Sequence, residues 1–344
     1  MSESALVSVI VLNWNGGRHV LSCLDSIACQ DCANLEVIVV DNGSTDGSEA
    51  MIRDGYPGVR LVENRANLGF AAGANVGIRA ARGEYVVLLN NDAELDAASI
   101  SEMLRAIQRD GRYGACASRI YLKFEQNLLD AAGIAVCPDG LSIGRGRLER
   151  GERYNREEEV FFGSGCCIMC RREMLEDVKV GDEYFDESFF MYADDTDLGW
   201  RAALRGWRCI YAPGALAYHL HSASSEDYSP LKAFLVERNR IWLQAKYFPF
   251  IMLCRGQLFT ALRYLFQAYG AFRGKGAAGA FSNERSKGEL IVILLRAWAS
   301  ALQGMPSVLK KRRLIQKRRT VGAKEIAALA KAYGIGARQV GLAR

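Results

Sequence analysis

Continuous apolar runs separated by helical patterns constrain the fold of this sequence more than any other feature. Four such runs occupy the first 90 residues: VSVIVLN (7–13), EVIVVDN (36–42), VRLVEN (59–64) and YVVLLN (85–90). Strands that are apolar on both faces and alternate with helices are typical of parallel sheets that helices cover on either side. The sequence therefore predicts an α/β fold with a mostly parallel central sheet.

Each predicted strand ends in polar residues, namely Asn13, Asp41-Asn42, Asn64 and Asn90-Asn91-Asp92. In open α/β sheets, ligands bind at the carboxyl ends of the strands. Loops are commonly polar, and this alone would explain one or two of the positions. It explains an aspartate after two separate strands less well, so we expect a ligand site at this edge.

The chemistry of these residues favours a nucleotide and a divalent cation. Asp92 follows a buried strand, and Mg²⁺ or Mn²⁺ commonly takes one or two protein carboxylates together with phosphate oxygens. Asp41 can accept hydrogen bonds from ribose hydroxyls or base NH groups, and the loop GSTDGS behind it supplies backbone NH groups. The alternative is a set of solvated loop acids.

Two further groups of residues suggest chemistry in the second half of the predicted sheet. Asp194, Asp195 and Asp197 crowd the start of a predicted helix (196–206). One acid would suffice to stabilise a helix N-terminus, whereas three repel one another and suggest a cation or a proton-transfer role. His219 and His221 close a short predicted strand and are candidate metal ligands, although a lone histidine is usually structural.

Near residue 225 the alternation of strand and helix patterns ends, and long amphipathic helical patterns replace it. We expect a catalytic domain over 1–225 and an amphipathic helical region over 226–344, with helices at 231–247, 250–272, 288–303 and 306–319. Residues 248–272 are strongly apolar but carry Arg255 and Arg263, and residues 310–319 hold seven cations in ten positions.

Two interpretations of this helical region remain open. It is either a subdomain packed on the catalytic core or a set of helices that lie in the interface of an anionic membrane. No signal peptide and no stretch of about 18 uninterrupted apolar residues is present, so we expect a cytoplasmic protein, peripheral on the inner face of the cytoplasmic membrane. A nucleic-acid partner is not expected, because no recognised nucleic-acid motif accompanies the basic run.

Ten cysteines are present, and six of them fall into two groups, neither of which has a paired CxxC partner at zinc-finger spacing. This favours small buried side chains in a reducing compartment over a structural zinc site.

Six short motifs, in order, resemble glycosyltransferase family 2, and in particular its bacterial rhamnosyltransferase-like members. They are VSVIVLNWNG, VDNGSTDGS, NLGFAAGANVGI, LLNNDAEL, FFMYADDTDLGWRAALRGW and YHLHSAS, and they span residues 6–225. The resemblance implies a GT-A fold and an inverting glycosyltransferase that uses Mg²⁺ or Mn²⁺. It also implies a nucleotide-diphosphate sugar donor and a lipid-linked or cell-envelope saccharide acceptor.

The resemblance also implies roles for particular residues. Asp195 stands in the place of the catalytic base with Asp194 beside it, and Asp92 and His219 in the places of the metal ligands. The donor and nucleotide contacts implied are Asn13, Asp41, Asn42, Ser44, Asn67, Gly69, Phe70, Asn75 and Asn91. We expect Asp197, Trp200 and Arg201 to face the acceptor or a phosphate, with a plain surface ion pair as the alternative for Arg201.

The sequence departs from the family pattern at two places. Asn90-Asn91-Asp92 lacks the first carboxylate of the DxD metal motif, and Asp194 is shorter than the glutamate of the "ED" pair. The QxxRW motif of processive synthases is not seen, which favours addition of a single sugar.

Two other functions were weighed against the glycosyltransferase. A sugar-nucleotide pyrophosphorylase would need a Gly-rich loop with a phosphate-binding cation near the N-terminus, and LNWNGGRH does not match it. A catalytically inactive family member that binds a glycan or a partner is the remaining alternative.

Overall fold

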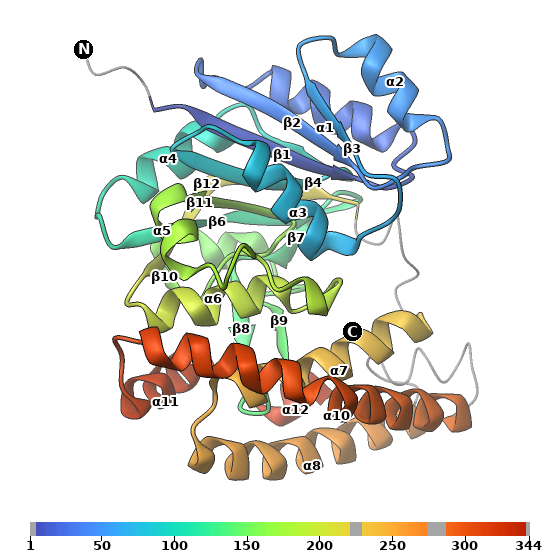
Figure 1. Cartoon of the computed structure of the whole chain (residues 1–344), viewed down its shortest axis with the longest axis vertical. Coiled ribbons are helices and arrows are strands. Elements are labelled where there is room, and N and C mark those ends of the chain that lie inside the picture. The colour runs from blue at the N-terminus through green and yellow to red at the C-terminus, as the bar shows by residue number, and fades with distance from the viewer. Residues whose placement is uncertain (1–4, 221–228, 274–286, 342–344) are drawn as a thin grey trace. The chain divides into compact units, whose positions relative to one another are not determined.

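A computed structural model describes residues 5–220, 229–273 and 287–341 of the chain (Figure 1). The chain divides into two compact units. Unit 1 comprises Met1–Ile134 and Gly144–Ser224, and unit 2 comprises Ala135–Ile143 and Ser225–Arg344. The short segment Ala135–Ile143 thus belongs with the C-terminal helices, although the sequence-based boundary places it in the first domain.

Unit 1 is built on a ten-stranded sheet with the order β10-β12-β6-β11-β4-β1-β2-β3, to which β5 and β7 are added at β12 and β6. The strands are β1 (Val7–Asn13), β2 (Leu35–Asp41), β3 (Arg60–Glu63), β4 (Tyr85–Asn90), β5 (Ala93–Leu95), β6 (Tyr113–Leu122), β7 (Glu125–Ala131), β10 (Glu158–Val160), β11 (Cys167–Arg171) and β12 (Arg208–His219). Strands β8 (Ile134–Val136) and β9 (Ser142–Gly144) form a separate pair. The predicted α/β fold with a mostly parallel sheet is confirmed.

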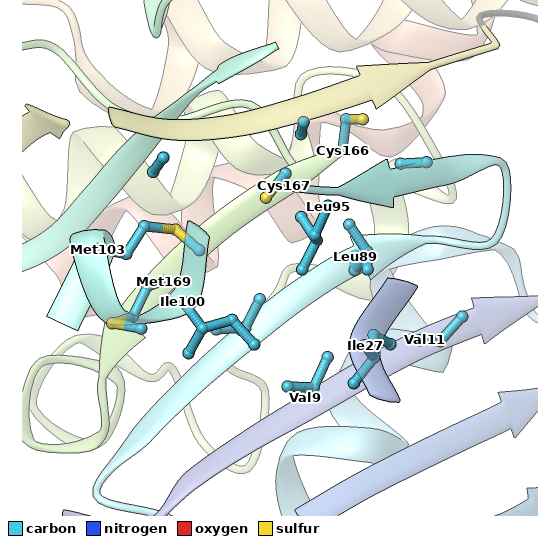
Figure 2. Packing of buried hydrophobic residues seen from close by; sticks show 14 of the residues in the cluster. Val9, Val11, Ile27, Leu89, Leu95, Ile100, Met103, Cys166, Cys167 and Met169 are labelled. Carbon is cyan, nitrogen blue, oxygen red and sulfur yellow. The ribbon is translucent and has the colours of Figure 1, made fainter. Parts of the chain in front are cut away.

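Helices cover both faces of the sheet, as strands apolar on both sides require. Val7, Val9 and Val11 of β1 point into a cluster with buried residues of α1 (His19–Ala28), α2 (Ser48–Gly55) and α4 (Ser99–Ile107); Figure 2 shows part of it. The alternate residues Ile10 and Leu12 face α3 (Gly69–Ala80) on the other side.

Glycines let α3 approach the sheet closely. A Cβ at Gly77 would lie 2.4 Å from Cγ2 of Ile10, and one at Gly73 would lie 2.6 Å from Cδ2 of Leu12. Gly69, Gly73 and Gly77 are spaced by four residues and therefore share one face of the helix. The glycines of the NLGFAAGANVGI segment thus serve the packing of helix against strand.

Parallel register brings the strand ends to one edge. Asn13 lies opposite Asp41 in the β1–β2 pair, Leu12 opposite Asn90 in the β1–β4 pair, and Asp41 opposite Glu63 in the β2–β3 pair. The second half of unit 1 adds η1 (Gly151–Tyr154), α5 (Arg172–Val178), η2 (Glu187–Phe189) and α6 (Asp194–Leu204).

Unit 2 holds the helices α7 (Pro230–Tyr247), α8 (Phe250–Arg273), α10 (Lys287–Arg318), α11 (Ala323–Ala332) and α12 (Ala337–Gly341). The two helices predicted at 288–303 and 306–319 are one helix, because α10 continues through Pro306. By length and composition, Gly288–Arg318 passes a test for a membrane-crossing helix, a test that core helices of soluble proteins also pass. The sequence analysis had indicated no such helix.

A buried network of charges ties Ala135–Ile143 to these helices. Asp139 accepts a hydrogen bond from Nε of Arg263 at 2.8 Å, and Glu237 accepts one from Nε of Arg240 at 3.0 Å. All four side chains are buried. The two arginines balance the charges of the two acids within this network, as burial of ions requires.

Seven of the ten cysteines are buried and none forms a disulfide, in line with the prediction of small core side chains. Three of them lie on β11 or directly before it: Cys166 and Cys167 (Figure 2), and Cys170.

Candidate active site

The ends of β1, β2 and β4 are joined by a buried amide network. Asn13 donates through Nδ2 to Oδ1 of Asp41 at 2.8 Å and to Oγ of Ser48 at 2.9 Å, and more weakly to Oγ of Ser44 at 3.2 Å. Asn91 in turn donates to Oδ1 of Asn13 at 3.0 Å. The structure therefore brings four of the predicted donor residues together at one edge of the sheet.

Asp41 holds the turn that follows β2. Its Oδ2 accepts hydrogen bonds from the backbone NH groups of Gly43 and Ser44, and its Oδ1 accepts from Asn13 and from Oγ of Ser44. A carboxylate has about four acceptor positions, and all are used here. A direct bond from Asp41 to a nucleoside requires the exchange of one of these contacts.

The remaining predicted donor residues fall into two groups. Asn42 bridges Asn64 and the carbonyl of Gly69, while Asn67 accepts from the NH of Gly69; these contacts shape the start of α3. Phe70 packs edge-on to Phe185 at 5.8 Å.

Asn75, another predicted donor contact, is engaged in hydrogen bonds inside the protein. Asn75 is fully buried, and its amide both donates to the carbonyl of Phe185 at 2.8 Å and accepts from the NH of Phe185 at 2.7 Å. It also donates to Oε1 of Glu187. It links α3 to the segment before η2 and is not available to a donor.

Asp92 and His219 are brought together by strand pairing. β5 runs antiparallel to β12 with Ala93 opposite His219, so the residue before β5 lies at the end of β12. Nε2 of His219 lies 3.2 Å from Oδ1 of Asp92. Two ligands of one cation, each about 2.1 Å from it and at right angles, are about 3 Å apart, so this pair of atoms fits a shared divalent cation.

Asp130 of β7 holds the other side of the imidazole. Its Oδ2 lies 2.8 Å from Nδ1 of His219, and its Oδ1 is paired with Arg147. Burial lowers the pKa of His219, but the neighbouring Cys166, Asp130 and Asp92 raise it well above the usual value. A carboxylate on the far nitrogen is the arrangement that fixes the ring of metal-binding histidines.

The number of protein ligands is small. Among the residues that the structure describes, no group of three or more His, Cys, Asp or Glu side chains is placed to hold a metal ion. Two side chains agree with a cation that takes further ligands from a diphosphate. His221, the neighbour considered from the sequence, lies outside the described residues.

Asp195 is half-buried in the first turn of α6 and its carboxylate is firmly held. Oδ2 accepts from the NH of Gly165 at 3.0 Å, and Oδ1 accepts from the NH of Thr196 at 2.6 Å. Burial raises the pKa of Asp195 above its ordinary value, although the hydrogen bonds from Gly165 and Thr196 oppose this. A raised pKa suits a proton acceptor that works near neutral pH.

Asp194 differs from Asp195 in its partners. It is buried, its Oδ1 accepts from the NH of Asp195, and its Oδ2 has no hydrogen-bond partner among the described residues. Burial, together with the charge of Asp195, raises the pKa of Asp194 well above its usual value. Of the two acids, Asp195 is the better stabilised in its charged form.

One short loop connects the two parts of the site. The NH of Gly165 binds Asp195, while the next residue, Cys166, lies beside His219 and accepts from the NH of Asn90 through its carbonyl at 2.9 Å. Phe70 covers Gly165, since a Cβ there would lie 3.0 Å from Cζ of Phe70. Asp195 and the Asp92–His219 pair are therefore tied to adjacent residues of the chain.

The segment before α6 adopts an unusual backbone. Phe190, Tyr192 and Ala193 all have positive φ, and the NH of Met191 bonds to the carbonyl of Phe189 at 2.8 Å around Phe190. Positive φ costs non-glycine residues free energy, and such residues gather at functional sites. This backbone leads directly into Asp194 and Asp195.

Asp197, Trp200 and Arg201, predicted to face the acceptor or a phosphate, make contacts inside the protein. All three side chains are buried. Arg201 donates to Oδ2 of Asp197 at 3.1 Å and to the carbonyls of Val178 and Tyr184. These contacts fasten α6 to the segment after α5, so neither an acceptor nor a phosphate reaches them, and the pair is not on the surface.

Two residues of the site were missed in the sequence. Asp130 lies in none of the six sequence motifs. It is brought to His219 by the pairing of β7 with β6 and of β6 with β12. Trp14 follows Asn13 and is 38% exposed beside the amide network, where its ring can cover a base. An exposed tryptophan directly after a buried strand was a signal available in VSVIVLNWNG.

Comparison with known proteins identifies the family of this chain. The model of glycosyl transferase family 2 matches residues 8–179. The N-acetylglucosaminyl-diphospho-decaprenol L-rhamnosyltransferase of Mycobacterium tuberculosis is 30% identical over 290 residues, which cover 74% of this chain and 90% of that protein. The chain belongs to glycosyl transferase family 2. This glycosyltransferase is also similar to the amylovoran biosynthesis glycosyltransferase AmsB of Erwinia amylovora, with 25% identity over 244 residues, or 69% of this chain and 76% of AmsB.

Solved structures agree on the fold of this family 2 glycosyltransferase. GalNAc-T7 with UDP, GalNAc and Mn²⁺ aligns with a TM-score of 0.61 at 11% identity, over 77% of this chain and 51% of the other. Residues 1–349 of S. aureus TarS in complex with UDP align with a TM-score of 0.53 at 19% identity, over 95% and 91%. The predicted GT-A fold is confirmed, and the chain is a nucleotide-sugar glycosyltransferase by family.

Proposed function

We propose that this glycosyltransferase is an inverting, metal-dependent enzyme that transfers one sugar from a nucleotide-diphosphate sugar to a hydroxyl of a lipid-linked or cell-envelope glycan. The observation that carries the proposal is the pair Asp92–His219, 3.2 Å apart and joined through Gly165-Cys166 to the held carboxylate of Asp195. A cation site beside a general base is what displacement of a diphosphate by a hydroxyl requires.

The donor lies at the edge where β1, β2 and β4 end. Asn13, Ser44 and Asn91 form its polar floor, and Trp14 offers an apolar face for the base. Asp41 acts mainly by holding the turn 43–44, whose backbone it binds.

Asp92 and His219 are the residues that would hold Mg²⁺ or Mn²⁺, and Asp130 keeps the imidazole oriented so that Nε2 faces Asp92. When bound, the cation supplies positive charge that stabilises the departing nucleoside diphosphate. Asn90-Asn91 gives no second carboxylate, so His219 replaces the missing acid of the DxD motif.

Asp195 accepts the proton of the acceptor hydroxyl while that oxygen attacks the anomeric carbon. The bond between that carbon and the diphosphate oxygen breaks in the same displacement, which inverts the anomeric centre. The bonds from Gly165 and Thr196 aim the carboxylate, and general-base help of this kind is worth about 10²–10⁴-fold in rate.

The proposed class of acceptor is based on the similarity of this chain to a mycobacterial relative. The name of the mycobacterial relative specifies a sugar carried on a diphospho-polyprenol, and that relative matches most of this chain. A lipid-linked acceptor would place this enzyme at the inner face of the cytoplasmic membrane, held there by an anionic lipid surface.

The stereochemical outcome can be measured without knowledge of the acceptor. Glycosyltransferases slowly hydrolyse their donor, and proton NMR at early times distinguishes the anomer first released. We expect the released sugar to have the configuration opposite to that in the donor, with hydrolysis dependent on Mn²⁺ or Mg²⁺. Release of the retained anomer would contradict the single displacement.

A further inference from the structure

Helix α8 presents a long apolar stripe to solvent. Its exposed side chains recur every three to four residues and so share one face: Ile251, Leu258, Leu262, Leu265, Tyr269 and Phe272. Leu258 and Leu265 are 67% and 68% exposed. The helix has 24 residues and is therefore about 36 Å long.

The opposite side of α8 is anchored in unit 2. Arg263 is bound by Asp139, and Oγ1 of Thr260 lies 3.3 Å from the same carboxylate. Tyr264 donates to Oε1 of Glu237 on α7 at 2.7 Å. This network fixes the rotation of α8 about its axis, so the apolar stripe stays on the outside.

Helix α10 repeats the arrangement in the same unit. Ile291, Leu295, Trp298, Leu302 and Leu309 are exposed and recur at helical spacing, whereas Ile293, Ala297 and Ala301 are buried on the other side. Nε1 of Trp298 donates to Oε1 of Glu237, the acceptor that also binds Tyr264 of α8. One side chain of each helix therefore binds the same oxygen of Glu237 on α7.

The charges beside these stripes are mainly positive, and Glu289 in the first turn of α10 is the one acid of the two helices. α8 contains no acidic residue, and the exposed Arg255 and Arg273 flank its stripe. The basic end of α10 adds the exposed Lys310, Arg313 and Lys317. Arg312 is not part of this surface, because it donates to the carbonyls of Ala245 and Phe248.

We infer that the exposed stripes of α8 and α10 form a docking surface for an anionic lipid bilayer, on which both helices lie in the plane of the interface. Exposed apolar patches mark interaction sites. A flank in which arginines and lysines outnumber acids complements lipid phosphates, and interfacial helices show this division between an apolar face and basic edges. A spanning arrangement would require α8 to withdraw Arg263 and Thr260 from Asp139.

The docking surface rests on the proposed function, because a lipid-linked acceptor would require contact with a membrane. Its test uses neither donor nor acceptor. Flotation of the full chain is measured with vesicles of phosphatidylcholine alone and of phosphatidylcholine mixed with phosphatidylglycerol. The double variant Leu258→Glu/Leu265→Glu is compared with Gln303→Glu/Ser307→Glu, which adds the same charge at exposed polar positions of α10.

We expect wild type and the Gln303/Ser307 variant to float with the anionic vesicles, and less so as salt is raised. The Leu258/Leu265 variant should lose at least about tenfold in partition coefficient, since burial of a leucine in an apolar phase is worth roughly that factor or more. An unchanged unfolding midpoint of both variants shows that unit 2 is intact.

Three results would overturn the inference. Wild type that fails to bind anionic vesicles excludes the lipid surface. Equal binding of the Leu258/Leu265 variant places the lipid contact elsewhere. A wild-type dimer that this variant converts to a monomer, without vesicle binding, shows that a second copy covers the stripes. Failure of nucleotide binding would count against the proposed function and leave the vesicle result standing.

Discussion

The carboxylate of Asp195, the proposed general base, is held by three hydrogen-bond donors. Asp195→Asn keeps the shape of the side chain but cannot accept a proton in the same way. We expect kcat to fall about 10²–10⁴-fold with little change in donor affinity. Initial rates and donor binding should be measured beside Asp54→Asn, an exposed acid of α2. Full activity of Asp195→Asn would show that another group is the base, whereas donor binding without turnover in the wild type would favour the inactive, glycan-binding alternative.

The raised pKa of Asp195 sets the acidic limit of activity. The base works when deprotonated, and burial moves its pKa above the usual aspartate range near about 4. Activity should therefore be lost as the pH falls through this raised value, which places the acidic limb of the kcat/KM profile above about pH 4. A limb at or below pH 4 would show that Asp195 titrates like an exposed acid.

Asp130 is a positioning residue for His219. Asp130→Asn retains one oxygen for the ring but removes the charge that orients it. Loss of such a partner typically weakens metal binding about 10–100-fold. Titration of Mn²⁺ followed by electron paramagnetic resonance measures this directly, with Asp54→Asn as the control. Equal Mn²⁺ affinity of both variants would remove Asp130 from the site.

At the scale of elements, the close approach of α3 to β1 depends on the absence of a side chain. Gly77→Ala places a Cβ 2.4 Å from Ile10, and overpacking of this kind usually costs about 1–3 kcal/mol. Gly55→Ala on α2 meets nothing within 4 Å and serves as the matched control. Denaturant unfolding should show a lower free energy for Gly77→Ala and no loss for Gly55→Ala. Equal stability of the two variants would mean that α3 can shift freely.

The buried network of unit 2 gives a second prediction at this scale. Asp139→Ala leaves Arg263 buried without its main partner, and removal of one member of a buried pair commonly costs about 3–5 kcal/mol. The double variant Asp139→Ala/Arg263→Met should recover part of that loss in the free energy of unfolding. If the two substitutions were additive, the pair would not be coupled.

The hydrophobic periodicity of the sequence predicted those strands and helices whose apolar pattern lies within one continuous segment. The runs 7–13 and 85–90 are strands with those same bounds, and 231–247 is a helix within one residue of α7. The direction of β11 could not be predicted, because a strand buried on both faces has the same composition whether it runs parallel or antiparallel. The short strand predicted before His219 is the end of the longer strand β12, whose register shift between Ala212 and Leu216 lies at Pro213 and Gly214.

At the scale of the whole molecule, the site joins residues far apart in the chain. Sequence motifs pointed to Asp92, His219 and Asp195, which the structure connects through Gly165-Cys166. The internal hydrogen bonds of Asn75, Asp197 and Arg201 could not be predicted, because nothing in a motif distinguishes a polar residue that bonds inside the protein from one that contacts a ligand. The contact of Asp130 with His219 could not be predicted, because Asp130 lies in no motif and reaches His219 only through strand pairing.

The central claim is that Asp92 and His219 form a donor-dependent metal site. The most direct measurement is the thermal unfolding midpoint with UDP-, GDP- and dTDP-sugars, with and without Mn²⁺, for wild type, Asp92→Ala and Asp54→Ala. A ligand at 100 times its Kd stabilises the native state by about 2.7 kcal/mol. We predict a shift of several degrees with one nucleotide, dependent on Mn²⁺, kept in Asp54→Ala and lost in Asp92→Ala. A shift in Asp92→Ala equal to that of wild type, or no shift with any donor, would contradict the claim.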